Sequence, residues 1–297
     1  ALLFAIHPVQ VETVCWISAS KIVLSTFFYL SALICYIQYM RNSKWQYLLA
    51  SVVSSILAMG CKEQSVIIVP CLLLFDWMLF KRNMRSLKVY IEKVYYLIPA
   101  IAIFIVTLVA NKDTGEEIIG YTIVDRFIFL CYSVFKYLLI SAIPFKLSYL
   151  YPFPFQVGEK IPMALWIYPF VILFIGYVIY LNRRKPLLVF CTLFFILHLL
   201  PVLHVIPLPR YVVVADRYLY IPYIAFAIGL SILSYHLYER QRKWILYAGF
   251  LYCSYLCVYT ASYAPAWKNS DTLKEHFKEV LKKRETNLSI NFKHEKQ

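Results

Sequence analysis

The stretch Met59–Val66, "MGCKEQSV", puts a lysine, a glutamate and a glutamine side by side between two long apolar runs. Apolar residues make up 61% of the 297 residues and charged residues only 15%, whereas a soluble domain is about half apolar and a quarter charged. This composition predicts an all-α polytopic membrane protein, because a helix satisfies its own backbone hydrogen bonds within lipid. The charged stretch is then expected to be a turn between two membrane helices.

Nine apolar segments are each long enough to cross a bilayer once. Each has about 17–20 residues, which span the hydrocarbon core at about 1.5 Å per residue. They cover residues 22–39, 45–61, 64–80, 94–110, 126–143, 164–181, 187–206, 219–237 and 244–262. Residues 1–6 have the composition of the end of one more helix, and the chain begins at Ala1 with neither Met nor a signal-peptide pattern. We therefore expect a fragment that lacks its front.

The net charge of +14 lies mostly in short connections between the apolar segments. The basic connections are "MRNSK" (40–44), "KRNMRSLKVYIEK" (81–93), "NRRK" (182–185) and "ERQRK" (239–243). By the positive-inside rule all four face the cytosol. A basic face for nucleic acid is not indicated, because the charges are spread over separate loops.

The basic connections also limit how many segments cross the membrane. Between 93 and 182 the number of crossings must be even, yet three apolar segments lie there. The segment 126–143 contains Arg126 and Lys136, which favours an amphipathic helix lying in the membrane interface. We therefore predict that all of 111–163 lies on the outer, non-cytosolic side, together with the C-terminal tail.

With that assignment the polar interruptions of the apolar pattern share the outer side. They are "HPVQVETVCW" (7–16), "CKEQ" (61–64), the segment 111–163 and "HVIPLPRYVVVADRYLYIP" (204–222). A charge costs about 2.5–3.5 kcal/mol at the bilayer centre and less near its surface. Four such clusters predict a polar cavity that opens outward, with a set of unrelated turns as the alternative.

Two cations in these clusters are candidate phosphate ligands. The Arg217 guanidinium offers a planar fork to phosphate oxygens, and the Lys62 ammonium offers a compact charge close to membrane depth. The alternatives are a solvated turn for Lys62 and an arginine that reaches the interface for Arg217. The side chains expected to contact sugar or acceptor, or to support the cations, are His7, Glu12, Glu63, Asp216 and His204. For Glu12 the alternative is a capped helix start in head-group water.

Other polar residues do not form a recognisable metal or nucleotide site. The eight Cys contain no CxxC pair, and His198 and His204 lack a metal-ligand spacing, so we expect no metal. No phosphate-binding loop, GxGxxG, GxSxG or HExxH pattern occurs, so no soluble-type cofactor is expected. Asp76 is expected to pair locally with Lys81 or Arg82.

The C-terminal part changes character at about residue 265. The stretch "NSDTLKEHFKEVLKKRETN" (269–287) is polar and amphipathic, and Thr272 with Glu275 has the spacing of a capping box. A single helix cannot bury its own apolar stripe. Residues 265–297 therefore predict the start of a soluble helical repeat region that stops early.

Several strings together resemble one family. They are "ALLFAIHPVQVETVCWISASKIVLSTFFYLSALICYIQY", "CKEQSVIIVPCLLLFDW", "LSYLYPFPF", "VVVADRYLYIPYIAF" and "WKNSDTLKEHFKEVL". In order and spacing they are similar to the membrane portion of the transmembrane and tetratricopeptide-repeat (TMTC-type) protein O-mannosyltransferases and their bacterial relatives. The resemblance covers nearly the whole chain.

That resemblance implies a GT-C glycosyltransferase fold of about eleven spans, about nine of them present in residues 1–264. The implied donor is a polyprenyl-phosphate sugar, dolichyl-phosphate mannose in eukaryotic members, and the acceptor is a Ser or Thr hydroxyl of a protein. The site would face the lumen of the endoplasmic reticulum or the bacterial periplasm. The acidic first outer loop of the family would precede Ala1, so the general base is expected upstream of Ala1. The catalytic residue therefore stays unknown, and the fragment is expected to be catalytically incomplete.

Two other classes of function stay open at this point. A membrane scaffold that binds partners through its repeats would have the same composition. A transporter is less favoured, since only 7 of 297 residues are glycine, and transporters rely on small-residue packing and broken helices.

Overall fold

A computed structural model describes residues 1–110, 120–149, 151–203, 212–240, 242–276 and 278, and in this part of the chain every regular element is a helix. The α-helices are α1 (Leu2–Ile6), α2 (Val11–Cys15), α3 (Ser20–Asn42), α4 (Trp45–Cys61), α5 (Ile68–Met78), α6 (Leu87–Ala110), α7 (Ile123–Ala142), α8 (Ile167–Leu181), α9 (Pro186–Leu199), α10 (Pro222–Arg240) and α11 (Arg242–Tyr263). Short 3-10 turns join them: η1 (Pro8–Gln10), η2 (Ile17–Ala19), η3 (Glu63–Ile67), η6 (Met163–Trp166), η7 (Asp216–Leu219) and η8 (Ala264–Trp267). The predicted all-α class is confirmed.

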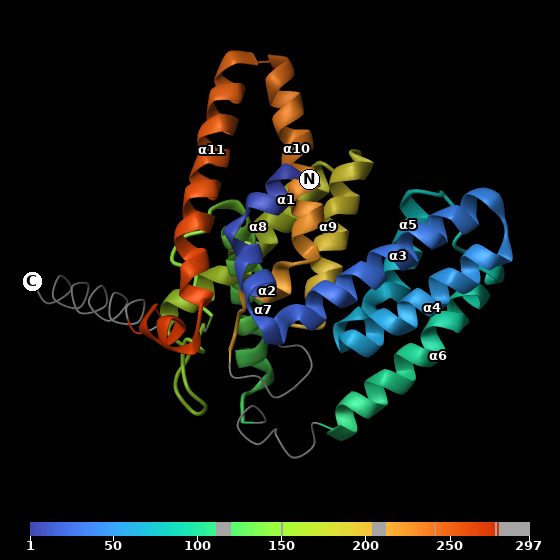
Figure 1. Cartoon of the computed structure of the whole chain (residues 1–297), viewed down its shortest axis with the longest axis horizontal. Helices are drawn as coiled ribbons and strands as arrows, with labels where there is room; N and C mark the ends of the chain where they lie inside the picture. Colours follow the sequence, from blue (N-terminus) through green and yellow to red (C-terminus); the bar gives the residue numbers. More distant parts are fainter. Residues whose placement is uncertain (111–119, 150, 204–211, 241, 277, 279–297) are drawn as a thin grey trace, which may run out of the picture.

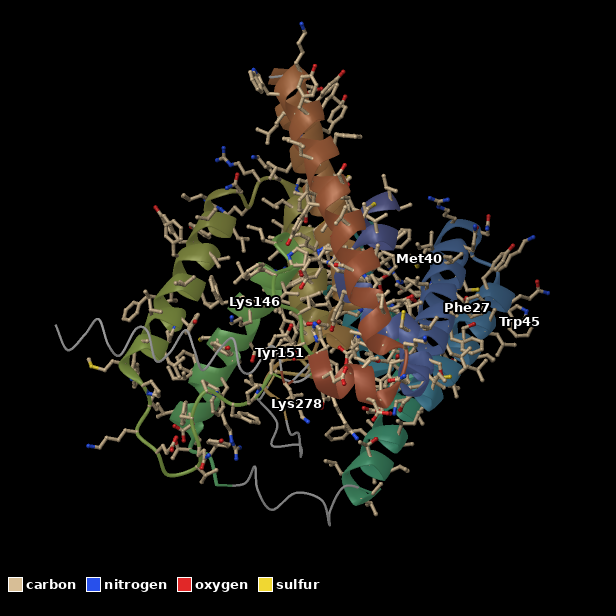
Figure 2. All side chains as sticks on the ribbon, turned by 60° about the vertical axis from the view of Figure 1, so that its left-hand side comes forward. Phe27, Met40, Trp45, Lys146, Tyr151 and Lys278 are labelled. Atoms are coloured by element: carbon tan, nitrogen blue, oxygen red, sulfur yellow. The ribbon has the colours of Figure 1, made fainter. Side chains whose placement is uncertain are left out.

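Four stretches of the described helices are long and apolar enough to cross a membrane. They are Ile17–Asn42, Leu87–Ala110, Met163–Leu181 and Lys243–Trp267, and Trp45–Cys61 and Pro186–Leu199 are shorter apolar helices. Large apolar side chains are exposed: Phe27 is 63% exposed and Trp45 67%, and Trp45 lies at the edge of the bundle in Figure 2. These helices and this surface are compatible with a membrane protein, and the count of nine spans and the GT-C fold stay predictions.

Hydroxyl groups fix the antiparallel packing of α3 and α4. The Ser25 hydroxyl donates to the Ala58 carbonyl at 2.9 Å, and the Ser51 hydroxyl donates to the Ala32 carbonyl at 2.7 Å. All of these groups are buried, and polar contacts of this kind hold helices together where the solvent is as apolar as the side chains. Ser65 of η3 shares a hydrogen bond with Ser25 at 2.7 Å, which ties the turn after α4 to the start of α3.

A buried ionic cluster joins α3, α5 and α6 at the other end of these helices. Lys93 Nζ lies 2.6 Å from Asp76 Oδ2, and the Tyr36 hydroxyl donates to Asp76 Oδ1 at 2.6 Å. Arg82 Nη1 lies 2.6 Å from Glu92 Oε2 and 3.4 Å from Asp76 Oδ2. Asp76 thus pairs with Arg82 as expected, but its shorter contact is to a lysine 17 positions later.

This cluster corrects the boundaries predicted for the second basic connection. Residues 81–93 were predicted to form a loop, but α6 begins at Leu87. Glu92 and Lys93 therefore lie inside the helix and are buried. A pattern based on charge alone assigns them to solvent, because it does not include the partners that neutralise them. The predicted segment 64–80 is also divided, into the 3-10 turn η3 and an α-helix of 11 residues.

The two ends of α3 differ in character, with the ionic cluster at one end and the turn that follows α4 at the other. Tyr36 of α3 is close to Asp76 of α5 at the first end, and Ser25 is close to Ser65 at the second. Helix α9 runs toward the second end, where His198 bonds to the Tyr29 hydroxyl at 2.8 Å. In Figure 1 the α10–α11 hairpin stands beside these helices, with its connection at the top and the end of α11 in the lower half.

Helix α7 ends beside the middle of α11, and the residues that follow α7 run back along α11 toward its C-terminal end. The Tyr252 hydroxyl, at the middle of α11, donates to the carbonyl of Ala142, the last residue of α7. The chain then follows α11 back, because the Leu147 amide donates to the Tyr259 hydroxyl at 3.0 Å. Such a return is compatible with the even parity predicted between the flanking connections. The placement of 126–143 in the membrane interface stays a prediction.

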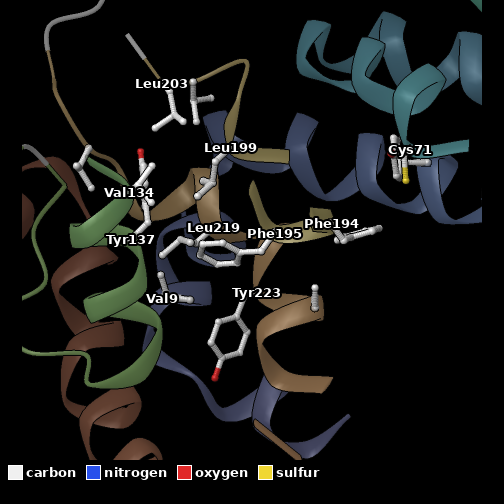
Figure 3. Packing of buried hydrophobic residues seen from close by; sticks show 14 of the residues in the cluster. Val9, Cys71, Val134, Tyr137, Phe194, Phe195, Leu199, Leu203, Leu219 and Tyr223 are labelled. Carbon is white, nitrogen blue, oxygen red and sulfur yellow. The ribbon is translucent and has the colours of Figure 1, made fainter. Parts of the chain in front are cut away.

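Buried apolar side chains of α7, α9 and α10 form a common core (Figure 3). Val134 of α7, Phe195 and Leu199 of α9, and Leu219 of η7 are all at least nine-tenths buried. This core sets the position of η7, from which Asp216 and Arg217 project.

Substitution of Asp76 by Asn should strongly destabilise the protein. The change leaves Lys93 buried, with a side chain only 4% exposed, and removes its closest carboxylate. Breaking a buried ion pair on one side costs about 3–5 kcal/mol. The control is Glu239→Gln in the exposed pair with His236, where the side chains are 56% and 66% exposed and a loss below about 1 kcal/mol is expected. Thermal unfolding in detergent measures both, and equal shifts for the two variants would contradict the ionic cluster.

Cysteine labelling should separate the two ends of the bundle. We expect Ser43→Cys and Arg184→Cys to react from one face of sealed vesicles, and Val157→Cys and Asn269→Cys from the opposite face. All four positions are exposed, and the exposed native residues Cys15 and Cys257 are first replaced by Ser. A membrane-impermeant maleimide gives the readout, and modification of positions 43 and 157 from the same face would rule out this topology.

Candidate functional site

The segment "VVVADRY" (212–218) is held in place by backbone contacts on both sides. The Val213 amide donates to the Tyr151 carbonyl at 3.0 Å, within an isolated antiparallel bridge between Tyr151 and Val214. The Ala215 amide donates to the Tyr137 hydroxyl at 3.3 Å. The 3-10 turn η7 then starts at Asp216. The backbone directly before Asp216 and Arg217 is therefore fixed in position.

Arg217 pairs with Glu12, which lies in the first turn of α2. Arg217 Nη1 is 2.5 Å from Glu12 Oε1, and the Arg217 backbone amide donates to Glu12 Oε2 at 2.9 Å. The Glu12 side chain is fully buried, whereas that of Arg217 is 20% exposed. Glu12 thus holds Arg217 through two contacts, and the pair joins segments 205 positions apart in the chain.

Asp216 is enclosed next to this pair. The Tyr151 hydroxyl donates to Asp216 Oδ1 at 2.9 Å and accepts from the Ser148 amide at 3.2 Å. Asp216 Oδ2 has no hydrogen-bond partner among the described residues. Burial raises the pKa of Asp216 well above its usual range, and the nearby Glu12 carboxylate raises it further. The charged form of Asp216 is therefore disfavoured, whereas the Glu12 carboxylate has the Arg217 guanidinium as its partner.

His7 lies in the wall behind these residues and is fully buried. Its Nδ1 accepts a hydrogen bond from the Val9 amide at 3.3 Å, and its ring lies 4.3 Å from the Tyr223 ring. Burial lowers the pKa of His7 to about 3, so the imidazole is neutral. His7 therefore caps η1, and it is not part of the cavity wall described next.

Lys62 and Arg217 line the same small cavity, although they lie 155 positions apart in the numbering. Lys62 directly follows α4, and its Nζ is 2.9 Å from Glu63 Oε1. Its side chain is 15% exposed and that of Glu63 44%. The cavity has a volume of about 30 Å³ and is lined by Ile22, Ser25, Thr26, Tyr29, Lys62, Gln64, Ser65, Ile67, His198, Arg217, Tyr218, Tyr220, Ile221 and Pro222. The two predicted phosphate ligands are therefore brought together.

The cavity contains polar residues that sequence reasoning did not select. Ser25, Tyr29 and Ser65 lie in apolar runs, where a single hydroxyl is read as packing. His198 was expected to pack: its ring stacks on Phe194 at 4.0 Å, and its Nε2 lies 2.8 Å from the Tyr29 hydroxyl. Only the pairing of α3 with η3 and α9 reveals that these groups face one space.

Aromatic rings border the exposed side of Arg217. Its guanidinium carbon lies 5.5 Å from the centre of the Trp16 ring and 5.0 Å from that of Tyr218. Trp16 is also 5.9 Å from Trp267 of η8. Cation–π contacts of this kind stabilise a partly desolvated guanidinium. Trp16, Tyr218 and Glu12 together therefore hold the Arg217 side chain in one orientation.

Several predictions fall outside the described residues. His204 is one of them, as are 111–119 of the outer segment and most of the predicted repeat region. In the described start of the tail, Asn269 rather than Thr272 caps the helix, because Asn269 Oδ1 accepts from the Thr272 amide at 2.8 Å. The described residues contain no cluster of three or more His, Cys, Asp or Glu that could hold a metal.

Comparison with protein-family models, with curated proteins and with solved structures found no significant match. The proposed function therefore rests on the geometry of this site together with the resemblance of the sequence motifs.

The two glutamates of the site should differ strongly in their effect on stability. Glu12→Gln leaves the Arg217 guanidinium buried without its carboxylate, and we expect a loss of about 3 kcal/mol. Glu63→Gln is the matched control, because its side chain is 44% exposed and exposed pairs contribute below about 1 kcal/mol. Thermal unfolding in detergent tests the difference. A Glu12→Gln variant as stable as Glu63→Gln would show that the buried pair does not hold η7.

Proposed function

We propose that the protein is a membrane glycosyltransferase that moves a sugar such as mannose from a polyprenyl-phosphate or dolichyl-phosphate donor to a Ser or Thr hydroxyl of a protein. The observation that supports this best is the cavity shared by Lys62 and Arg217 at the end of the bundle. We assign the reaction to the lumenal side of the endoplasmic reticulum membrane in a eukaryote, or to the periplasmic side of a bacterial inner membrane.

Lys62 and Arg217 suit a leaving lipid phosphate. The planar guanidinium can contact two oxygens at once, and the ammonium adds a compact second charge. Their side chains are only 15% and 20% exposed, so their fields are less screened than at an open surface. Negative charge grows on the phosphate as the bond between the sugar and the phosphate oxygen breaks. Fixed cations stabilise that charge more in the transition state than in the bound donor.

The cavity has one apolar side, which suits a phosphate carried by a lipid. Ile22 of α3, Ile67 of η3 and Ile221 before α10 line it together with the two cations. Only the part of the donor next to the phosphate would meet these side chains, while the phosphate contacts Lys62 and Arg217. A free inorganic phosphate would gain nothing from them.

The size of the cavity limits what it can hold. A buried water needs about 10–15 Å³ by the same measure, so about 30 Å³ accommodates a small anion and no sugar ring. We therefore assign the cavity to the phosphate alone. The sugar and the acceptor hydroxyl are assigned to the side where Trp16, 36% exposed, borders Arg217. No general base is assigned among the described residues.

The enclosed residues then act by positioning the cations. Glu12 orients Arg217, and Glu63 orients Lys62. Asp216 acts through Tyr151, which ties η7 to the chain that returns from α7. Asp216 and His7 are too deeply buried to touch a substrate directly.

Removal of either cation should lower sugar transfer sharply. In the full-length protein we expect Arg217→Ala and Lys62→Ala each to reduce kcat by about 100-fold, the usual loss when one charge-stabilising donor is removed. Transfer from radiolabelled polyprenyl-phosphate mannose to a Ser- and Thr-rich peptide in proteoliposomes is the measurement. Lys44→Ala is the control, because Lys44 is an exposed lysine at the opposite end of the bundle.

A parallel filter assay of donor binding separates the alternatives. Weaker donor binding by the folded Arg217→Ala variant, with unchanged binding by Lys44→Ala, supports the phosphate assignment. Wild-type transfer by Arg217→Ala would refute it. If the unaltered protein neither binds the donor nor transfers sugar, the scaffold hypothesis is favoured instead.

A further inference from the structure

A second, larger cavity lies between α7, α8, α9 and α10. Its volume is about 380 Å³, and its walls are almost entirely apolar, with Leu138, Ile175, Phe195 and Leu230 among the lining residues. An apolar cavity of about 150 Å³ already stays free of water and takes a benzene-sized guest. The cavity between these four helices, here called the apolar chamber, has room for a segment of a hydrocarbon chain.

Two of the residues that line the apolar chamber are glycines. Gly176 of α8 and Gly229 of α10 line it, and the whole chain has only 7 glycines. A glycine inside a helix costs about 1 kcal/mol relative to alanine, so close packing of the helices would be the usual reason to keep it. Here a Cβ atom at Gly176 would meet nothing within 4 Å, and one at Gly229 would only touch Cys191 at 3.8 Å. The glycines thus border empty space rather than a neighbouring helix.

One end of the apolar chamber lies at the basic connection 182–185. Ile179, near the end of α8, and Leu188, near the start of α9, line that end. Arg183 packs on the Tyr180 ring at 4.1 Å and donates to the Tyr180 carbonyl, so it is held against α8. Arg184 and Lys185 are exposed, and within the described part of the chain neither forms an ion pair with a carboxylate.

We propose that the apolar chamber binds an anionic phospholipid, with one acyl chain between α8 and α10 and the head-group phosphate at Arg184 and Lys185. The positive-inside rule accounts for basic residues in this connection, but it does not account for an open chamber beside them. An anionic lipid fits both features, because its chain is apolar and its charge is opposite to that of the connection. Helices α9 and α10 separate this chamber from the cavity of Lys62 and Arg217, so the site does not depend on the proposed sugar transfer.

Native mass spectrometry of the detergent-solubilised protein tests this inference. The probes are phosphatidylglycerol and phosphatidylcholine with identical acyl chains. Each basic side chain near an anionic head group adds roughly fivefold in affinity, so phosphatidylglycerol should bind about tenfold or more tightly than phosphatidylcholine. Equal binding of the two lipids would overturn the charge assignment.

Matched variants separate the contribution of the acyl chain to lipid binding from that of the head group. Gly176→Leu with Gly229→Leu fills the apolar chamber and should lower the binding of both lipids by tenfold or more. Gly249→Leu in α11, where a Cβ also meets nothing, should leave binding unchanged. Arg184→Gln with Lys185→Gln should abolish the preference for phosphatidylglycerol, whereas Arg41→Gln with Lys44→Gln in another basic connection should keep it. Unchanged binding in the filled variant, or an equal loss of preference in both charge variants, would overturn the proposal.

Discussion

A charge enclosed in an apolar helix bundle needs a partner of opposite sign within hydrogen-bonding distance, and this requirement governs both ends of the structure. Lipid offers no water to a lone ion, so an unpaired charge would be forced to neutralise or to unfold its surroundings. At one end Asp76 meets Lys93, and at the other Glu12 meets Arg217. Each pair joins helices that are separate in the sequence, so the pairs fix the arrangement as well as the charge.

The charges are neutralised at both ends of the bundle, but a cavity lies beside the cations at only one of the two ends compared here. The Asp76 cluster combines two cations and two carboxylates, and the Lys93 side chain is only 4% exposed. Its groups already contact one another, which leaves no place for a ligand. Lys62 and Arg217 are also neutralised, and Lys62 is no more exposed than Arg82 of the Asp76 cluster (15% and 16%), but Lys62 and Arg217 border a common cavity. Paired cations beside open space are the arrangement expected of an anion site, because their partners keep them oriented while the ligand approaches.

Much of the fold could be predicted from hydropathy, and the reasons for the failures are physical. Apolar runs located the helices closely: α4 spans the predicted 45–61, and α11 extends the predicted 244–262 by two residues at its start and one at its end. The charged stretches at 62 and 217 could be singled out because ions are costly in lipid. The partners could not. Lys93 follows a basic stretch that is typical of a loop, and Tyr151 lies in an irregular stretch. Only the folded chain reveals that Lys93 pairs with Asp76 and that Tyr151 donates to Asp216.

Helix α9 shows how one apolar helix can serve two separate spaces. Cys191 and Phe195 face the apolar chamber, whereas His198 borders the cavity of Lys62 and Arg217. The hydropathy pattern of α9 is that of a helix apolar on all sides, and in a soluble protein such a helix is buried in the core. The histidine is tolerated because both ring nitrogens have partners, the Phe194 carbonyl and the Tyr29 hydroxyl. Cys191, Phe195 and His198 share one face of α9 but lie at different levels along it, so a side chain can change one space without altering the other. A lipid at one level and a phosphate at the other can therefore bind independently.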